Sequence, residues 1–412
     1  MSPNILGWQL PSLPKSRGKR VLVFAGFVLV LVVLSRCAFR GAPTAAATSE
    51  EIRVLIAAPE NSIRIRAQDL RCPRIGDLGL VHAIEVRTQA KGLLVIPLRE
   101  ERQSDAMSEP AFVLDDGNVD ITWLGPATWT TGAASNANSS RQHFGRLTVH
   151  AADDGSLRCV LHAPLELYVT GVIAAEMGTS FPPAALAAQA IAARGFALTA
   201  RARRKDSQDF DVFDDERDQV YRGVDAAPSL IEAVRATTDL VLAYDGTLLR
   251  SYYASTCGGR TRDGYAFFRD VPREPFRGVV CEACSDSPLY RWSRKIERGA
   301  FTQLGCGRSG SLSFELFADD DRGDLEKVRI TGPHGAVIAP ASSLSRLRPL
   351  PSRWIDSIRD RGDDVEVRGR GFGHGVGLCQ YGARGYARAG WSCTAILQHY
   401  FPGASITHLR DL

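Results

Sequence analysis

The sequence lacks an excess of charge of one sign, and it contains no internal repeat. Fifty Lys and Arg residues face 46 Asp and Glu residues over 412 positions, which leaves a formal net charge of +4. A protein that binds nucleic acid gathers its cations on one element, so this small and scattered excess argues against a nucleic-acid partner. The 44% hydrophobic and 23% charged content is close to globular averages and excludes disordered, collagen-like and coiled-coil chains.

Several common site motifs are also missing. No His-Glu-x-x-His occurs, so the usual zinc ligands of metalloproteases are lacking. The glycine-rich segment 369–383 does not fit G-x-G-x-x-G in any register, and it has no Gly-Lys-Ser/Thr ending. Dinucleotide binding and a phosphate-binding P-loop are therefore disfavoured.

One apolar run stands near the N-terminus, from Val21 to Leu34, and four basic residues precede it. We predict a basic cytoplasmic n-region over residues 1–20 and a signal anchor or signal peptide over residues 21–39. The positive-inside rule places the rest of the chain outside the cytoplasm, anchored in the cytoplasmic membrane. Residues 40–51 are rich in Ala, Thr and Pro and are expected to form a linker.

The remaining residues, 52–412, are predicted to form one domain with a β-rich part over 52–161 and a second part over 162–412. Alternating apolar residues predict strands at 52–56 and 62–66. Two apolar runs, Leu240 to Tyr244 and Leu248 to Tyr253, flank Asp-Gly and predict a hairpin, and a last helix is expected near Thr394 to Tyr400. The expected fold class is α+β: a mixed, mainly antiparallel β core with a helical insertion that carries Glu176, behind the N-terminal membrane segment.

Glu176 is the sharpest single signal in the sequence. Apolar residues recur with helical period from Leu165, and this period places Glu176 on the apolar face, just before Gly178 ends the helix. A second helix is predicted from Pro182-Pro183 to about Arg204. Desolvation and the negative end of the helix dipole both raise the pKa of such a carboxyl, which suits a general acid. The alternative is a Glu at a fraying helix end that turns out to solvent or pairs with a basic residue such as Arg194.

The segment 369–383 has glycine at every second position of its first half. A strand without side chains on one face lets another backbone or a ligand approach closely. His374 and Gln380 would project near that surface. The alternative is tight sheet packing around a satisfied histidine.

The chain has nine cysteines, and four of them form a third group of candidate site residues. Cys281 and Cys284 make a C-x-x-C turn, while Cys257 and Cys379 each lie in a glycine-rich stretch. Four thiolates would close a tetrahedral structural zinc site, whereas an oxidising compartment would favour disulfides.

Together, in this order, these constellations resemble the SpoIID/LytB domain family of bacterial cell-wall proteins. The resemblance covers nearly all of residues 52 to 405. It rests on five segments: Leu165 to Met177 with Ala185 to Arg194, Asp218 to Gly223, Ser255 to Thr261, the His374-containing glycine segment, and His399 to Gly403.

The resemblance implies a lytic transglycosylase that acts on peptidoglycan glycan strands without a catalytic cofactor. Glu176 would be the catalytic acid that cleaves the MurNAc–GlcNAc β-1,4 bond and leaves a 1,6-anhydro end. A hydrolase normally needs two carboxylates, whereas here the sugar's own 6-hydroxyl attacks and one residue serves both steps. The same resemblance suggests residues that line the glycan groove: Gln189, Arg194, Ser255, His374, Gln380 and Tyr381.

The chain departs from the family pattern at three positions. Many members have lysine where Ala187 stands, so a charge contact is missing there. Many have serine in place of Cys257 and Cys379, and cysteine at both positions favours a shared structural zinc site with Cys281 and Cys284.

Two other functions remain open. A non-catalytic module of the same fold would bind glycan strands or stimulate a cell-wall amidase, and it would not need an acid at position 176. A thiol enzyme would use Cys379 with His374.

Overall fold

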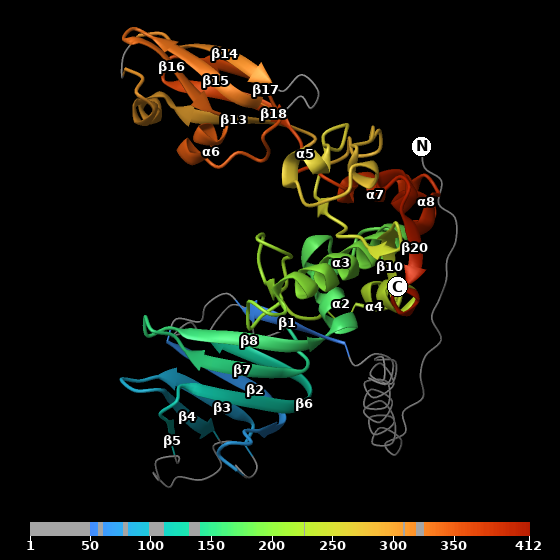
Figure 1. Cartoon of the computed structure of the whole chain (residues 1–412). Coiled ribbons are helices and arrows are strands. Elements are labelled where there is room, and N and C mark those ends of the chain that lie inside the picture. Colours follow the sequence, from blue (N-terminus) through green and yellow to red (C-terminus); the bar gives the residue numbers. More distant parts are fainter. Residues whose placement is uncertain are drawn as a thin grey trace, which may run out of the picture. The chain divides into compact units, whose positions relative to one another are not determined.

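The computed structural model describes residues 50–56, 61–76, 81–98, 111–131, 141–225, 227–307, 310–318 and 325–412 (Figure 1). Glu50 to Leu412 belong to one compact unit. The predicted n-region, the membrane segment and nearly all of the linker lie outside the described residues. Within the described ranges, none of the helices has the length and apolarity needed to cross a membrane.

The N-terminal part is a nine-stranded sheet with the order β5-β4-β3-β2-β6-β7-β8-β1-β9. All neighbouring strands are antiparallel except β1 and β9, which are parallel. In β1, Ile52, Val54 and Ile56 face the core and the intervening residues do not, as the alternation predicts. The strands are β1 (Glu51–Ile56), β2 (Ser62–Arg71), β3 (Ala83–Thr88), β4 (Leu93–Leu98), β5 (Phe112–Leu114), β6 (Asn118–Thr131), β7 (Arg146–Ala151), β8 (Leu157–Pro164) and β9 (Val212–Phe213).

Two helices follow the sheet and carry the site. Helix α2 (Leu165–Glu176) continues directly from β8, and α3 (Pro183–Arg204) begins with the predicted proline at its first turn. Gly178 ends α2 with φ +69°, and its N–H donates to the Ala174 carbonyl at 3.1 Å. Both helices therefore form where the sequence predicts them.

The predicted hairpin forms, but its second strand is shorter than expected. β10 (Leu240–Tyr244) pairs with β11 (Thr247–Leu248) across Asp245 and Gly246, which both have positive φ. Instead of continuing the hairpin, Tyr253 and Ala254 form β12, which pairs in parallel with β19 (Leu378–Cys379). β10 also pairs in antiparallel fashion with β20 (Ser405–His408), which gives a three-stranded sheet with the order β11-β10-β20.

A second hydrophobic core lies in the C-terminal part, around Phe301, Val328 and Val367. Two three-stranded antiparallel sheets, β13-β18-β17 and β14-β15-β16, supply most of it. Their strands are β13 (Arg291–Glu297), β14 (Ser313–Ala318), β15 (Leu325–Gly332), β16 (Gly335–Pro340), β17 (Ile355–Asp360) and β18 (Asp364–Arg370).

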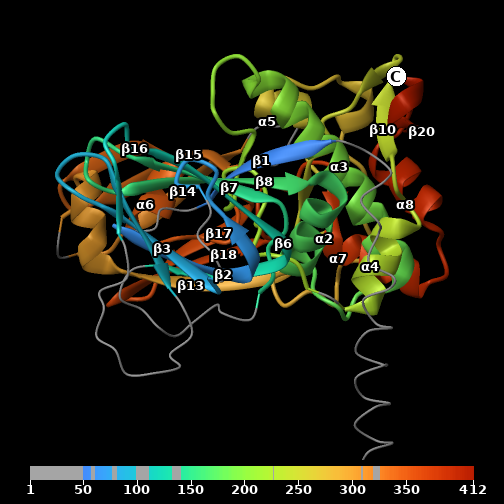
Figure 2. The ribbon, with the colours of Figure 1, turned by 90° about the horizontal axis from the view of Figure 1, so that it is seen from below.

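The last helical pair packs against α3. Helix α8 (Cys393–Tyr400) forms as predicted. Helix α7 (Gln380–Arg388) was not predicted, and it contains Gly382 and Gly385, which weaken a helix. Figures 1 and 2 both show α2, α3 and α7 grouped together. The other short helices are α4 (Pro228–Arg235), α5 (Gly264–Phe268) and α6 (Ser342–Leu347), with the 3₁₀ turns η1 (Glu274–Phe276), η2 (Arg298–Leu304) and η3 (Leu409–Asp411).

The structure is thus a mixed α+β fold with mostly antiparallel sheets, as predicted.

Candidate active site

Glu176 is the last residue of α2 and lies half-buried beside the first residue of α7. The backbone N–H of Val220 donates to Glu176 Oε1 at 3.0 Å. The side-chain amide of Gln380 donates to Oε2 at 3.3 Å. Three segments that are far apart in the sequence therefore meet at one carboxyl group.

Burial raises the pKa of Glu176 above its usual value, and the nearby Glu216 carboxylate adds to that effect. The hydrogen bonds from Val220 and Gln380 act in the opposite direction, because they stabilise the carboxylate. In the described part of the chain no cation lies within ion-pair distance of Glu176, and Arg194 pairs with Glu166 instead. The direction of the shift is the one expected from the sequence, and the alternative pairing with Arg194 is wrong.

Gly369 and Arg370 of the glycine segment end β18, but the residues from Gly371 to Gly377 are not part of a strand. Gly371, Gly373, Gly375 and Gly377 have φ of +77°, +88°, +73° and +73°, a left-handed conformation that favours glycine. At Gly377 a Cβ would lie 2.1 Å from the Tyr252 carbonyl oxygen, so another backbone does approach closely. The expectation of an extended strand was wrong, because alternating positive φ prevents a regular ladder.

His374 lies among aromatic rings. Its ring centroid is 5.2 Å from that of Phe268 and 5.8 Å from that of Tyr252. Its Nδ1 accepts a hydrogen bond from the Val376 N–H at 3.0 Å. Burial lowers the pKa of His374 to about 4, so the ring is neutral at pH 7. These contacts are those of a packed, satisfied histidine, which is the alternative that the sequence left open.

Ser255 and Tyr381 lie close to Gln380. The pairing of Ala254 with Cys379 in β12 and β19 brings the residues that follow side by side, and the Tyr381 N–H donates to the Ser255 carbonyl at 3.0 Å. Both residues are half-buried. The structure therefore gathers Ser255, Gln380 and Tyr381, and of these three residues Gln380 is the one that contacts Glu176.

Gln189 and Arg194 lie in the interior instead. Both are 0% exposed on α3. Arg194 is held by Glu166 at 2.6 Å and by the Leu240 carbonyl at 2.8 Å. Neither side chain can contact a bound glycan in this conformation, so their predicted place in the groove is not supported.

The four predicted metal ligands come together. One Sγ atom from each of Cys257, Cys281, Cys284 and Cys379 lies within 4.8 Å of all the others, and all four residues are buried. The Sγ atoms of Cys257 and Cys284 are 3.7 Å apart. Tetrahedral zinc with Zn–S bonds of about 2.3 Å separates its sulfurs by roughly 3.8 Å, so this donor set fits the ion.

Cys379 is poorly placed as a nucleophile. It is 1% exposed, and its Sγ accepts hydrogen bonds from the N–H groups of Cys257 and Gly382, both at 3.3 Å. Burial raises the pKa of its thiol. The geometry therefore does not favour a thiol enzyme built on Cys379 and His374.

Val220 is the contact of Glu176 that sequence reasoning missed. It lies in the segment Asp218 to Gly223, which is one of the segments carrying the family resemblance. Its functional group is a backbone N–H, and no residue type reveals where a backbone N–H points. The sequence therefore identified the segment but not the hydrogen bond that its backbone makes to Glu176.

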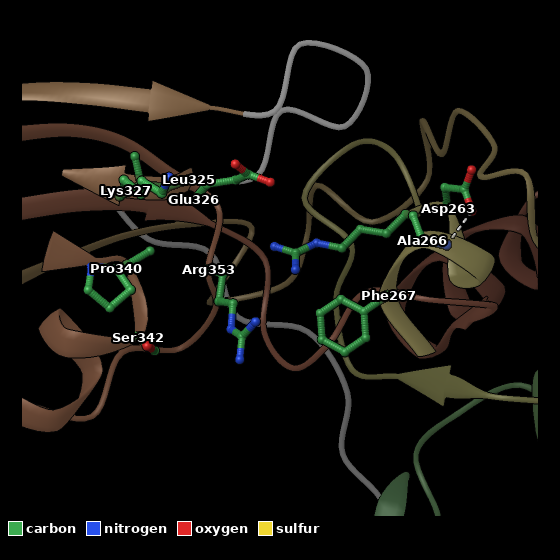
Figure 3. Close-up of a pocket in the computed structure, with 11 residues that line it drawn as sticks. Asp263, Ala266, Phe267, Leu325, Glu326, Lys327, Pro340, Ser342 and Arg353 are labelled. Carbon is green, nitrogen blue, oxygen red and sulfur yellow. Dashed lines mark hydrogen bonds between the residues drawn. The ribbon is translucent and has the colours of Figure 1, made fainter. Parts of the chain in front are cut away.

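A cavity of about 440 Å³ lies between α5 and the β14–β16 sheet (Figure 3). Figure 3 shows Phe267 on one side, with Pro340 and Lys327 on the other. Its eleven lining residues include neither Glu176 nor any other predicted site residue. This cavity is therefore separate from the carboxyl site.

Comparisons with known proteins identify a family and several relatives. The family model described as "Stage II sporulation protein" matches residues 153–244, which include α2 and α3. Stage II sporulation protein D of Bacillus amyloliquefaciens is 32% identical over 276 residues, covering 60% of this chain and 75% of the relative. The protein of the same name from Bacillus subtilis (strain 168) is 27% identical over 332 residues, which cover 76% of this chain and 90% of the relative.

The amidase enhancer of Bacillus subtilis (strain 168) is 25% identical over 292 residues, covering 58% of this chain and 40% of the relative. Fold and site define an α+β protein with a half-buried carboxyl group where the end of α2 meets the start of α7, and the relatives support an association with the cell wall. The chain belongs to the SpoIID family, whose proteins are related to cell-wall lytic enzymes.

Proposed function

We propose that the protein is a lytic transglycosylase that cleaves the MurNAc–GlcNAc β-1,4 bond of peptidoglycan glycan strands. The observation that supports this most is Glu176, a desolvated carboxyl group held by a backbone N–H and by the Gln380 amide. Its raised pKa keeps it protonated closer to neutral pH, as a general acid requires.

One carboxyl group suffices for the proposed reaction. Protonated Glu176 gives its proton to the glycosidic oxygen while the bond from that oxygen to the anomeric carbon breaks. The resulting carboxylate then accepts the proton of the MurNAc 6-hydroxyl while O6 bonds to the anomeric carbon. Glu176 ends in its starting state, no water is consumed, and the product carries a 1,6-anhydro end.

The hydrogen bonds at Glu176 suit this cycle. The Val220 N–H and the Gln380 amide both donate, so they stabilise the carboxylate that forms after the first proton transfer. Burial destabilises the same carboxylate and opposes them. The two effects together keep the group able both to give and to take a proton.

The proposed activity also predicts where the protein works in the cell. A protein that acts on glycan strands works outside the cytoplasm, and residues 21–39 would tether it to the membrane. Relatives named for sporulation and for amidase enhancement support a role at the cell wall. A cell-wall amidase is therefore a candidate partner.

Mass spectrometry of digestion products tests the proposal. Full-length protein and a Glu176→Gln variant are incubated with glycan strands that carry stem peptides and with strands that do not. New 1,6-anhydro ends from the wild type alone are expected, with binding retained in the variant. Wild-type turnover by Glu176→Gln would overturn the mechanism.

The variant Glu216→Gln tests the alternative that the protein is a hydrolase with a second catalytic carboxylate. Glu216 is exposed, and it is the acidic residue whose charge acts on Glu176. Loss of cleavage in Glu216→Gln, together with reducing ends from the wild type, would identify a two-carboxylate hydrolase. We expect instead that Glu216→Gln cleaves and still yields 1,6-anhydro ends.

A second candidate is a non-catalytic module that stimulates an amidase, which the likeness to the amidase enhancer favours. Glycan binding without cleavage, together with faster amidase turnover in the presence of the protein, would select it.

We also propose that the four-cysteine cluster holds structural zinc. Cys257 lies in the turn after Ser255, and Cys379 immediately precedes Gln380. Bound zinc would thus join the turn at Ser255, the C-x-x-C loop and the start of α7, and it would fix the position of Gln380 at Glu176.

A further inference from the structure

Gln219 is a fully satisfied polar side chain in the interior. It is 1% exposed. Its Oε1 accepts a hydrogen bond from the Tyr168 hydroxyl at 3.1 Å, and its Nε2 donates to the Tyr253 hydroxyl at 2.9 Å and to the Ala193 carbonyl at 3.2 Å. These partners belong to α2, β12 and α3. A buried amide with all of these bonds has little freedom to move.

The residue that follows Gln219 is the one that holds Glu176. Tyr168 and Glu176 are eight residues apart in α2, which is about 12 Å along the axis at 1.5 Å per residue. The Gln219 side chain bonds to Tyr168 within the helix, and the next residue along the chain, Val220, lies at the end of the same helix. The Val220 N–H donates to Glu176 Oε1 there at 3.0 Å.

The preceding residue is anchored too. Asp218 accepts a hydrogen bond from the Phe213 N–H at 2.9 Å and pairs with Arg204 at 2.8 Å. The peptide that presents the Val220 N–H is therefore held by two consecutive buried side chains. Only that of Gln219 connects to α2, the helix that carries Glu176.

We propose that Gln219, through Tyr168 and Tyr253, is the positioning residue of the site: it fixes the Val220 N–H that orients Glu176 and stabilises its carboxylate. The catalytic part of this inference rests on the proposed transglycosylase function. Gln219 itself does not touch the carboxyl group.

Among the residues that the structure describes, few ionisable groups act on Glu176. Glu216 lies on the loop before Gln219, Tyr168 on α2, Tyr253 on β12, and the neutral amide of Gln380 on α7. Burial raises the pKa of both tyrosines well above the usual value, so they stay neutral around pH 7. Glu216 is unchanged in every variant below and cannot account for differences among them.

Two variants remove different numbers of the hydrogen bonds that hold the Gln219 side chain. Gln219→Leu removes all three hydrogen bonds, and Tyr253→Phe removes one and preserves the ring. Losing the Val220 N–H raises the pKa of Glu176, so the alkaline limb of the kcat/KM profile should move to higher pH, further in Gln219→Leu than in Tyr253→Phe. We expect kcat/KM at the wild-type optimum to fall about tenfold in Gln219→Leu, the factor that corresponds to about 1.4 kcal/mol.

Tyr221→Phe is the matched control. Tyr221 is adjacent to Val220, 2% exposed, and its ring stacks on that of Tyr168 at 5.3 Å. Removing its hydroxyl perturbs the same buried region but leaves the Gln219 hydrogen bonds intact. The alkaline limb of Tyr221→Phe should coincide with that of the wild type, whatever its melting temperature.

A direct titration separates this inference from the proposed function. The carboxyl carbon of Glu176 is followed by NMR in full-length protein labelled with ¹³C-glutamate, and it is assigned by its absence in Glu176→Gln. A higher Glu176 pKa in Gln219→Leu and Tyr253→Phe supports the positioning role even if no cleavage is found, whereas missing cleavage counts against the transglycosylase alone. An unchanged Glu176 pKa in folded Tyr253→Phe and Gln219→Leu overturns the inference; if Gln219→Leu does not fold, Tyr253→Phe decides.

Discussion

At the scale of single residues, the burial of Glu176 affects both its pKa and the stability of the folded protein. Burial raises its pKa, which means that ionising the folded protein at this position is unfavourable. Unfolding releases the carboxyl group to water and to its usual pKa of about 4.5. A group with a raised folded-state pKa therefore lowers stability as the pH increases above the unfolded-state value.

Glu176→Gln should consequently be more stable than the wild type at pH 7. The difference should shrink as the pH falls, and it should vanish below about pH 4, where folded and unfolded wild type both keep the proton. Urea unfolding at pH 7 and at pH 4 measures it. Glu297→Gln, which changes an exposed carboxylate at the end of β13, serves as the control, and a gain independent of pH would refute the burial argument.

Arg194 shows the opposite case, a charge whose role is structural. Its guanidinium is completely buried and pairs with Glu166, whose side chain is 15% exposed. Replacing one partner of a buried pair leaves the other charge uncompensated.

Arg194→Leu should therefore lower the free energy of unfolding by about 3–5 kcal/mol. Arg235→Leu removes the exposed pair with Glu232 and should cost no more than about 1 kcal/mol. Chemical denaturation of both variants provides the comparison, and equal losses would contradict the structural assignment of Arg194.

At the scale of elements, α7 forms although its sequence contains two glycines. A Cβ on Gly382 would lie 1.9 Å from the Tyr400 hydroxyl and 2.5 Å from Cys281 Sγ. A Cβ on Gly385 would lie 2.0 Å from the Ala283 carbonyl oxygen. The glycines thus allow α7 to pack closely against the C-x-x-C loop, and this packing outweighs their low helix propensity.

Gly382→Ala should destabilise the protein, although alanine favours an isolated helix by about 1 kcal/mol. Because the new methyl group would displace Tyr400 or Cys281, the zinc content should fall as well. Gly299→Ala in η2 is the control, since nothing lies within 4 Å of a Cβ there. Thermal melts and metal analysis of the two variants decide; a stabilised Gly382→Ala would refute the packing argument.

At the scale of the whole molecule, the four-cysteine cluster joins segments that are up to 122 residues apart. Closing such long loops is entropically unfavourable, so a bound ion at their meeting point would stabilise the folded chain by an amount that depends on metal binding. Disulfides among the same cysteines would instead make the fold sensitive to reductant.

We expect one zinc ion per chain, and a lower melting temperature after chelation. Cys281→Ser should lose the ion, whereas Cys393→Ser, at a half-buried cysteine outside the cluster, should keep it. Metal analysis by mass spectrometry, alongside thiol alkylation without reductant, provides the readout. Two disulfides within the cluster would exclude the zinc proposal.

Residues with a local signal could be predicted, and residues that depend on distant contacts could not. The strand at 52–56, the Asp-Gly turn and helices α2 and α3 form from short-range periodicity, turn chemistry and proline placement, and the structure has each of them. Gln189 and Arg194 have site-like residue types, but tertiary packing buries both side chains completely. The glycine segment differs from a strand because its φ angles follow from the packed residues around it.

The candidate site divides in the same way. The position of Glu176 on the apolar face at the end of a helix follows from the sequence by itself, because helical period and a glycine stop are properties of neighbouring residues. The Val220 N–H, the Gln380 amide and the buried bonds of Gln219 are consequences of tertiary structure alone. They join positions up to 204 residues apart, and only packing determines which backbone and amide groups arrive at the carboxyl group.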